Sequence, residues 1–269
     1  MNADPTTLPA PVLSPGLVAL LDRVADRQRA DFGHMASDLK ADGSLITACD
    51  RWSDATLVEG LAQLCPGEGV LSEEGDKTVP GSDAYWVVDP LDGTTNFAAG
   101  IPYWAISLAR FEGGVPVLAV LDVPPLRQRI VAIRGQGAWR NDRLLQPPSR
   151  QSHPAGCASL CSRSIGVLQK LPDQRFPGKI RLLGVASLNL VSVAMGQTVS
   201  ALEATPKIWD LAAAWLVLSE LDCPIRWLVR SPEAIAAGAD LSTADFPVLA
   251  ADRPETLARF MPWAEALVS

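Results

Sequence analysis

The hydrophobic and polar positions in the first half of the chain predict helices beside a sheet. Apolar residues recur at helical spacing from about residue 16 to residue 36, and a second helix is predicted at residues 53–64. Between these helices, residues 40–47 predict a hairpin around the Asp42-Gly43 turn. Short apolar runs bounded by Gly and Pro predict strands at residues 105–110, 115–123 and 130–134. We therefore expect two helices beside a largely antiparallel sheet.

The second half of the chain alternates between strand-like and helix-like segments, which suggests a smaller α/β layer. Strands are predicted at residues 158–161, 180–183, 199–203, 225–229 and 247–250, and helices at residues 187–195, 208–221 and 254–267. Residues 146–156 are rich in Pro and Ser and give the best domain boundary. We expect a disordered tail at residues 1–14, a first domain at 15–150 and a smaller second domain at 151–269.

One run of residues carries the clearest chemistry. The apolar residues 85–88 predict a buried strand that stops at Asp89-Pro90, because proline cannot continue a central ladder. Asp92, Gly93 and Thr94 follow closely. Two carboxylates at a strand end, followed by free N–H groups and hydroxyls, suit a divalent cation that holds a phosphate. Turn chemistry alone would account for Asp-x-x-Asp, but it does not account for the whole run from Asp89 to Phe97.

The run 89–97 resembles the signature of the inositol monophosphatase family, which comprises Mg²⁺-dependent, lithium-sensitive phosphomonoesterases. Residues 71–75 resemble the Glu-Glu element of that family, residues 209–214 its Trp-Asp element, and residues 40–50 its N-terminal element. The four motifs occur in the family's order over roughly residues 15–221. The resemblance implies a mixed α+β and α/β fold, an alternating α-β-α-β-α layered sandwich of the inositol monophosphatase and fructose-1,6-bisphosphatase type.

The resemblance also implies a set of metal ligands. Glu73, Asp89 and the backbone carbonyl of Leu91 would bind a first Mg²⁺. Asp89 would bridge to a second ion, which Asp92 and Asp210 complete, and a third, weaker ion would use Glu73 and water. Two or three Mg²⁺ ions per site are therefore expected. Asp210 has an alternative role, because a carboxylate at a helix start stabilises the helix dipole.

Three residues are carried over as catalytic: Glu73, Thr94 and Asp50. In the family the last two positions form a pair, in which the hydroxyl orients the attacking water and the carboxylate accepts its hydrogen bond. Asp50 could instead be an ordinary helix-start residue. Lys40 could lie near the metal loop, although an exposed lysine is the default.

Substrate contacts are expected from Asp92, Asp210, Ala186 and Glu203, and from the N–H groups of Gly93 and Thr94. Glu203 precedes Trp209 by six residues, the spacing at which the inositol enzymes place a Glu that binds a substrate hydroxyl. The sequence departs from the family at residues 199–201 and 220–224, and its C-terminal region is divergent. These departures leave the metal ligands intact and leave the substrate open.

Composition and net charge limit the kinds of binding partner and site that we expect. A net charge of −7 argues against nucleic acid polymers and anionic membranes, and no apolar run approaches the length of a membrane span. Five irregularly spaced cysteines and two histidines disfavour a disulfide framework, a structural zinc site and a His-dependent nucleophile. Free thiols fit a reducing cytoplasm, where we expect the protein to act. Residues 135–138, Gly-Gln-Gly-Ala, predict a tight hairpin, because the third glycine of a nucleotide-binding fingerprint is missing.

The sequence therefore predicts Mg²⁺-dependent hydrolysis of a small-molecule phosphate monoester, with inositol monophosphate as the leading substrate. Histidinol phosphate, fructose 1,6-bisphosphate and 3′-phosphoadenosine 5′-phosphate are alternative substrates. A catalytically silent phosphate-binding regulator is the alternative from another functional class. A homodimer is expected from the resemblance alone.

Overall fold

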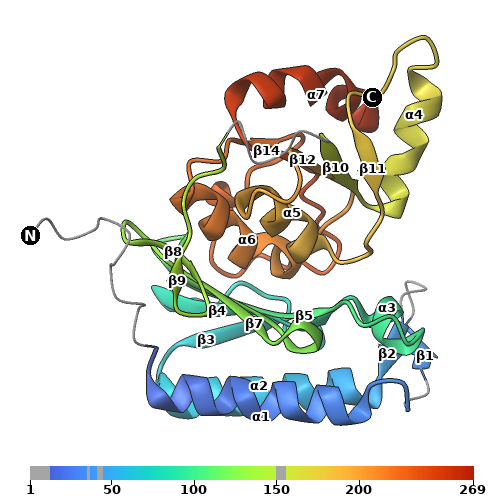
Figure 1. Cartoon of the computed structure of the whole chain (residues 1–269). Coiled ribbons are helices and arrows are strands. Elements are labelled where there is room, and N and C mark those ends of the chain that lie inside the picture. The colour runs from blue at the N-terminus through green and yellow to red at the C-terminus, as the bar shows by residue number, and fades with distance from the viewer. Residues whose placement is uncertain (1–12, 35–36, 41–44, 150–155) are drawn as a thin grey trace, which may run out of the picture.

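Helices and sheets alternate in layers through the molecule. The computed structural model describes residues 13–34, 37–40, 45–149 and 156–269. Figure 1 shows the order of the layers: a helical pair at the bottom, a large sheet, a second helical pair, a smaller sheet and an outer helical layer. The predicted α-β-α-β-α sandwich is confirmed.

The larger sheet has seven strands in the order β3-β4-β5-β6-β7-β8-β9, and every neighbouring pair except β3–β4 is antiparallel. Side chains from both faces of its central strands are buried, which explains why these strands read as nearly continuous apolar runs. The predicted hairpin at residues 135–138 is confirmed, since β7 turns directly into β8. The strands are β3 (Gly69–Ser72), β4 (Ala84–Asp92), β5 (Ala105–Glu112), β6 (Val115–Val123), β7 (Gln128–Ile133), β8 (Gly137–Arg140) and β9 (Arg143–Leu144).

Helices α1 (Pro15–Asp31) and α2 (Ala48–Leu64) cover the outer face of this sheet. The predicted start of the second helix at residue 53 was too late. Thr47 and Asp50 form a capping box, in which the Thr47 hydroxyl accepts from the Asp50 N–H and the Asp50 carboxylate accepts from the Thr47 N–H. This reciprocal cap satisfies free N–H groups at the helix start and begins the helix at Ala48.

Helices α5 (Ala186–Ala194) and α6 (Ile208–Glu220) lie between the two sheets. One continuous hydrophobic cluster joins the inner face of the larger sheet, both helices and the smaller sheet. Both helices are buried on nearly all sides, mostly through apolar residues, as expected for helices that are covered from both directions. The functional residues at their ends are therefore held by a core that the two sheets share.

The smaller sheet has the strand order β11-β10-β12-β14-β13. Its outer face packs against the final helix and a short helix, and aromatic residues of the final helix contribute to a third hydrophobic cluster. These elements are β10 (Cys157–Leu160), α4 (Val167–Lys170), β11 (Lys179–Arg181), β12 (Ser200–Glu203), β13 (Ile225–Trp227), β14 (Val248–Ala251) and α7 (Pro254–Val268).

The expectation that the central strand stops at Asp89-Pro90 was wrong, because β4 continues to Asp92. Pairing with β3 ends at Val88, so at Pro90 the strand has a neighbour, β5, on one side only. The β4–β5 register is also irregular between Asp89 and Asp92. Proline is tolerated where a strand bulges and needs no second ladder partner. The short helix α3 (Thr94–Ala98) follows directly and was not predicted.

Several predicted segments fall partly outside the described residues. The strands of the first hairpin, β1 (Ser37–Leu39) and β2 (Leu45–Thr47), pair antiparallel as expected, while its Asp42-Gly43 turn lies outside. Most of the N-terminal tail and much of the predicted boundary at residues 146–156 also lie outside. None of the helices in the described residues has the length and apolar content that crossing a membrane requires.

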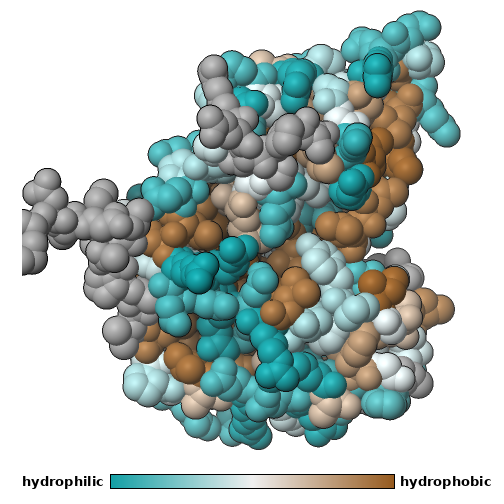
Figure 2. Space-filling model, in the orientation of Figure 1, coloured by the Kyte–Doolittle hydropathy of each residue, from teal (hydrophilic) through white to brown (hydrophobic). Residues whose placement is uncertain are grey.

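The surface carries separate apolar patches among polar residues. Figure 2 shows apolar side chains gathered along the side of the upper layers, where β11 lies in Figure 1. Leu182 and Leu183, which follow β11, are 47% and 37% exposed, and Ile101 is 49% exposed. The Leu183 carbonyl and the Tyr103 carbonyl accept hydrogen bonds from the same Asn96 amide, so these two loops are neighbours.

Candidate active site

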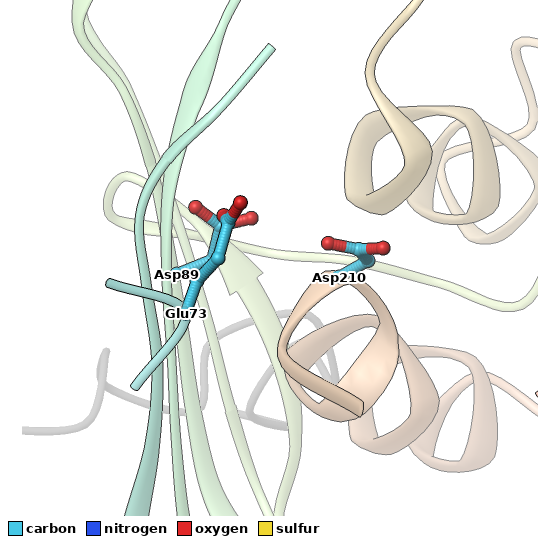
Figure 3. A group of neighbouring side chains, drawn as sticks. All are labelled: Glu73, Asp89 and Asp210. Carbon is cyan, nitrogen blue, oxygen red and sulfur yellow. The ribbon is translucent and has the colours of Figure 1, made fainter. Parts of the chain in front are cut away.

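Three carboxylates from two layers converge at the junction of the larger sheet and the inner helices. Figure 3 shows Glu73 and Asp89 on the sheet side and Asp210 facing them from the start of α6. One oxygen from each of the three residues lies within 4.8 Å of the others. The structure thus brings together three residues that are up to 137 positions apart in the sequence.

Hydrogen bonds to the backbone position all three residues. The N–H of Glu73 donates to the Val88 carbonyl at 3.1 Å, which extends the β3–β4 pairing by one residue. Asp89 Oδ1 accepts from the Leu91 N–H at 2.9 Å across the irregular part of β4. Asp210 Oδ2 accepts from the Lys207 N–H at 2.7 Å in the first turn of α6. Each side chain therefore keeps oxygen atoms available toward the centre of the group.

The electrostatics of this group favour a cation. Burial raises the pKa of Asp89 well above its ordinary value, and the neighbouring charges of Glu73, Asp92 and Asp210 raise it further. The pKa of Asp210 is also raised well above its ordinary value, mainly by burial and next by the charge of Asp92. The pKa of Asp92 is raised to about 6, mainly by burial. Buried carboxylates at this spacing repel one another until a positive charge compensates them, so the residues fit a divalent cation.

Asp92 and Leu91 lie beside the cluster and have other partners. Asp92 Oδ2 accepts from the Ser187 N–H at the start of α5, at 2.8 Å. The Leu91 carbonyl accepts from the Thr94 hydroxyl at 3.1 Å, while the Leu91 side chain is buried in a small aromatic cluster. The structure thus places the predicted ligands of the two metal positions around one site, although Asp92 is outside the three-residue group.

Lys40 reaches into the same region and is not an exposed lysine. Its ammonium lies 2.8 Å from Glu73 Oε1 and also forms an ion pair with Glu74. The Lys40 side chain is only 16% exposed. The lysine therefore compensates the Glu-Glu pair from the side of the β1–β2 hairpin.

Thr94 and Asp50 form the pair that the motifs predicted to lie together. The Thr94 hydroxyl lies 2.7 Å from Asp50 Oδ1, and the same hydroxyl lies 3.1 Å from the Leu91 carbonyl. A hydroxyl has one proton, so it donates to one of these acceptors at a time. Asp50 uses its other oxygen for the helix cap, and the carboxylate is 1% exposed.

Gly93 links the carboxylates to Thr94 in a conformation that requires glycine. Its φ of +102° lies in the left-handed region, and a Cβ at this position would lie 2.8 Å from Val185 Cγ2. A side chain would therefore be strained and would also clash. The turn brings the backbone close to the loop before α5.

A polar cavity of about 230 Å³ opens next to Asp92 and Asp210. Ala186 and Glu203, both predicted as substrate contacts, also line it, whereas Gly93 and Thr94 do not. Glu203 is 2% exposed, and burial raises its pKa to about 8. The full lining is Asp92, Cys161, Ser162, Arg163, Gly184, Val185, Ala186, Asn189, Glu203, Thr205, Pro206 and Asp210.

Eight of the lining residues were not among the predicted site residues, and two of these eight, Arg163 and Asn189, bring polar side chains with clear partners. Arg163 is the one cation of the lining, and its guanidinium donates to the Thr205 hydroxyl at 2.6 Å. Asn189 is fully buried and donates from Nδ2 to Glu203 Oε1 at 2.8 Å. A signal for Asn189 was present, because an amide in the apolar run of residues 188–194 is unusual for a packed helix.

The comparisons with known proteins agree with this geometry. A sequence model of the inositol monophosphatase family matches residues 17–238. The histidinol-phosphatase of Mycobacterium tuberculosis is 33% identical over 76% of this chain and 82% of that protein. The inositol-1-monophosphatase of Rhizobium meliloti is 34% identical over 71% of this chain and 76% of that protein. A staphylococcal inositol monophosphatase-1, solved as an inhibitory complex after soaking in lithium chloride, has a TM-score of 0.74 and 25% identity, covering 90% of this chain and 92% of that one.

Fold, site and relatives together place the chain in the class of phosphomonoester hydrolases. It belongs to the inositol monophosphatase family.

Proposed function

We propose that the protein hydrolyses a small phosphate monoester in a Mg²⁺-dependent reaction, with inositol monophosphate as the leading substrate. The observation that carries this proposal is the group of Glu73, Asp89 and Asp210, whose oxygens lie within 4.8 Å of one another beside a polar cavity. Carboxylate oxygens are the ligands that Mg²⁺ prefers in proteins.

Glu73, Asp89 and the Leu91 carbonyl would hold a first Mg²⁺, and Asp89, Asp92 and Asp210 would hold a second. A third, more weakly bound ion would use Glu73 and water. When bound, such ions neutralise phosphate oxygens, lower the pKa of water and stabilise a leaving oxygen. The repulsion among the buried carboxylates supports this ligand set, because it is relieved by bound cations.

The residues of the chain supply orientation. The Thr94 hydroxyl, 2.7 Å from Asp50, would orient the attacking water by accepting from it while donating to the carboxylate. Glu73 follows β3, and its N–H donates to the Val88 carbonyl. Its carboxylate would assist Thr94 in positioning the attacking water. The N–H groups of Gly93 and Thr94 would hold the phosphate, since glycine allows a close approach of the backbone.

The size and polarity of the cavity favour a small polar leaving group. Its volume of about 230 Å³ is below the roughly 300–1,000 Å³ typical of pockets for drug-sized ligands. This favours inositol monophosphate over 3′-phosphoadenosine 5′-phosphate. Histidinol phosphate is a second candidate for two reasons. Carboxyl groups that line the cavity can accept hydrogen bonds from its ammonium group, and a 33% identical relative is a histidinol-phosphatase. Fructose 1,6-bisphosphate is a third.

A phosphate-release panel tests the proposal. Inositol monophosphate, histidinol phosphate, fructose 1,6-bisphosphate, a nucleotide 3′-phosphate and p-nitrophenyl phosphate would be assayed with Mg²⁺ and with a chelator. We expect Mg²⁺-dependent release, fastest for inositol monophosphate. A chain that releases phosphate from none of these esters would be the silent phosphate-binding regulator instead.

We also infer a homodimer that acts in the cytoplasm on a small-molecule ester and not on a nucleic acid polymer. The exposed Ile101, Leu182 and Leu183 support an apolar interface near the cavity, because such patches commonly mark contact surfaces. Light scattering after size-exclusion chromatography would give the mass in solution, and a monomer would contradict the dimer.

A further inference from the structure

The floor of the cavity holds a buried polar pair whose chemistry the metal site does not use. Glu203 ends β12 and Asn189 lies in the middle of α5, and they are joined by the 2.8 Å hydrogen bond from Nδ2 to Oε1. Glu203 is 2% exposed and Asn189 is fully buried. The other polar neighbours of Glu203 include the Asp92 and Asp210 carboxyls and the Cys161 thiol. Among the residues that the structure describes, no cation pairs with Glu203.

This pair is costly for stability. A buried carboxyl with a neutral amide as its main partner has little compensation for lost hydration. Asn189 Oδ1 is also buried and has no hydrogen-bond partner within the described chain. Helix α5 is otherwise mostly apolar, so an apolar side chain at position 189 would fit the surrounding core. Packing alone therefore gives no reason for an asparagine here.

The amide does, however, fix the orientation of the carboxyl. A carboxyl at a strand end can rotate about its terminal bond, and the Asn189 donor restricts Oε1 to one direction. Both residues line the cavity together with Asp92, Ala186 and Asp210. A bound ester with its phosphate at the carboxylate cluster would therefore present its alcohol portion to this pair.

We propose that Asn189 is a positioning residue for substrate choice: it holds Glu203 so that the carboxyl accepts a hydrogen bond from a donor on the alcohol portion of the ester. This inference rests on the proposed phosphatase function. The donor is a hydroxyl in a polyol phosphate or an ammonium in an amino-alcohol phosphate, and both chemistries need an oriented acceptor.

The test compares Asn189→Ala with the wild type on inositol monophosphate, histidinol phosphate and p-nitrophenyl phosphate. For the preferred ester we expect KM to rise and kcat/KM to fall by about tenfold to a hundredfold, as for loss of one charge-assisted hydrogen bond. Activity on p-nitrophenyl phosphate, which has no such donor, should stay within about twofold. Which natural ester loses more identifies the donor as a hydroxyl or an ammonium.

Two further variants keep the test decisive. Leucine has the same number and branching of side-chain heavy atoms as asparagine, so Asn189→Leu covers the case in which Asn189→Ala does not fold. Ser192→Ala is the matched control, because Ser192 is buried in the same helix and donates to the Asn189 carbonyl but does not line the cavity. This control should leave the ratio of kcat/KM values between esters unchanged.

A double-mutant cycle with Glu203→Gln separates positioning from a structural role. If Asn189 acts through Glu203, the double variant should discriminate among esters no worse than Glu203→Gln alone. Additive losses, or equal losses on p-nitrophenyl phosphate and the natural esters, would overturn the inference. A wild-type protein inactive on every ester would instead overturn the proposed function, so the two failures are distinguishable.

Discussion

At the scale of single residues, Asp50 and Asp210 each take part in a helix cap and also contact or join other residues of the candidate site. Asp50 Oδ2 accepts from the Thr47 N–H while Oδ1 lies 2.7 Å from the Thr94 hydroxyl. Asp210 Oδ2 accepts from the Lys207 N–H, and the carboxyl also belongs to the three-residue cluster. The helix-start alternative and the site assignment therefore do not exclude each other, because a carboxylate has two oxygens with several acceptor positions. The sequence could not show this, since Thr94 is 44 positions from Asp50.

Replacing Asp89 with Asn should nearly abolish turnover and also raise the stability of the metal-free protein. Asp89 is placed to bridge two cations, and it is buried among like charges that raise its pKa. Neutralising it weakens metal binding and removes repulsion at the same time. Steady-state kinetics at saturating Mg²⁺ and thermal unfolding in a chelator would measure the two effects. Turnover within about tenfold of the wild type, which is a barrier change of only about 1.4 kcal/mol, would contradict the bridging role.

Thr94→Val should lower kcat by about a hundredfold or more, the range typical of a lost general acid–base or water-orienting group. Valine keeps the branched shape but cannot hydrogen-bond to Asp50, which lies 2.7 Å from the present hydroxyl. Thr94→Ser is the control and should retain most activity, because it keeps the hydroxyl. Equal losses in both variants would contradict this role, because Thr94→Ser keeps the hydroxyl and its loss would then come from disturbed packing.

Lithium should inhibit turnover without competing with the ester. The expected second metal position, formed by Asp89, Asp92 and Asp210, borders the cavity, but Glu203, the expected acceptor for the alcohol portion, is not one of its ligands. A small monovalent ion that replaces Mg²⁺ at this second position would leave ester binding intact and would slow turnover after the ester has bound. Initial rates at several ester and lithium concentrations should give an uncompetitive or noncompetitive pattern. Full activity at lithium concentrations well above that of Mg²⁺ would contradict this assignment.

At the scale of elements, segments with a clear local signal were predicted well. The strand predicted at residues 115–123 is β6, with the same bounds, and the helix predicted at 208–221 is α6, which ends one residue earlier. The strand β3 and the helix α3 were missed. Both are short, and both exist because of partners: β3 pairs in parallel with β4, and α3 follows the left-handed Gly93 turn. Such elements depend on tertiary contacts more than on their own residues.

The segment between β13 and β14 contacts the first half of the chain and also supports the start of α6. Its backbone pairs with residues 77–79 of the first half, and the Phe246 N–H donates to the Pro206 carbonyl at 2.9 Å. Asp245 forms a 2.9 Å ion pair with Lys207 and is 39% exposed, whereas Phe246 is fully buried.

These two adjacent residues should differ sharply in their effect on stability. Phe246→Ala should lower the free energy of unfolding by about 3–5 kcal/mol, as for a large buried aromatic. Asp245→Asn should change it by less than about 1 kcal/mol, because a partly exposed ion pair contributes little. Chemical denaturation of both variants would measure the difference. A large effect of Asp245→Asn would show that the ion pair, and not the core, holds the start of α6.

At the scale of the whole molecule, the site joins parts of the chain that form different sheets. Glu73 and Asp89 come from the larger sheet, whose strands span residues 69–144, and Asp210 comes from the second half. A single hydrophobic cluster also runs from the larger sheet through α5 and α6 to the smaller sheet. The division into domains at residues 15–150 and 151–269 stays a prediction. Because the two parts share this hydrophobic core, we expect them to unfold together.

Mg²⁺ should therefore stabilise the whole molecule, and more strongly as the pH rises. In the folded, metal-free protein the pKa of Asp92 is about 6, above its ordinary value of 3.8, and the pKa values of Asp89 and Asp210 are also raised. A carboxyl whose pKa is raised in the folded state binds protons more tightly there. Its contribution to stability is therefore lost as the pH rises from its ordinary pKa to its raised pKa, for Asp92 from 3.8 to about 6.

Bound cations replace the protons and remove this loss, because ligand carboxylates must be ionised. Saturation at a hundred times Kd adds about 2.7 kcal/mol, which corresponds to a rise in Tm of roughly 5–10 °C for a chain of this size. The difference in Tm between Mg²⁺ and chelator should be small at about pH 5 and larger at about pH 8. Asp89→Asn should show a reduced difference at both pH values. A shift that is equal at both, or that survives in Asp89→Asn, would place the binding of Mg²⁺ outside this cluster.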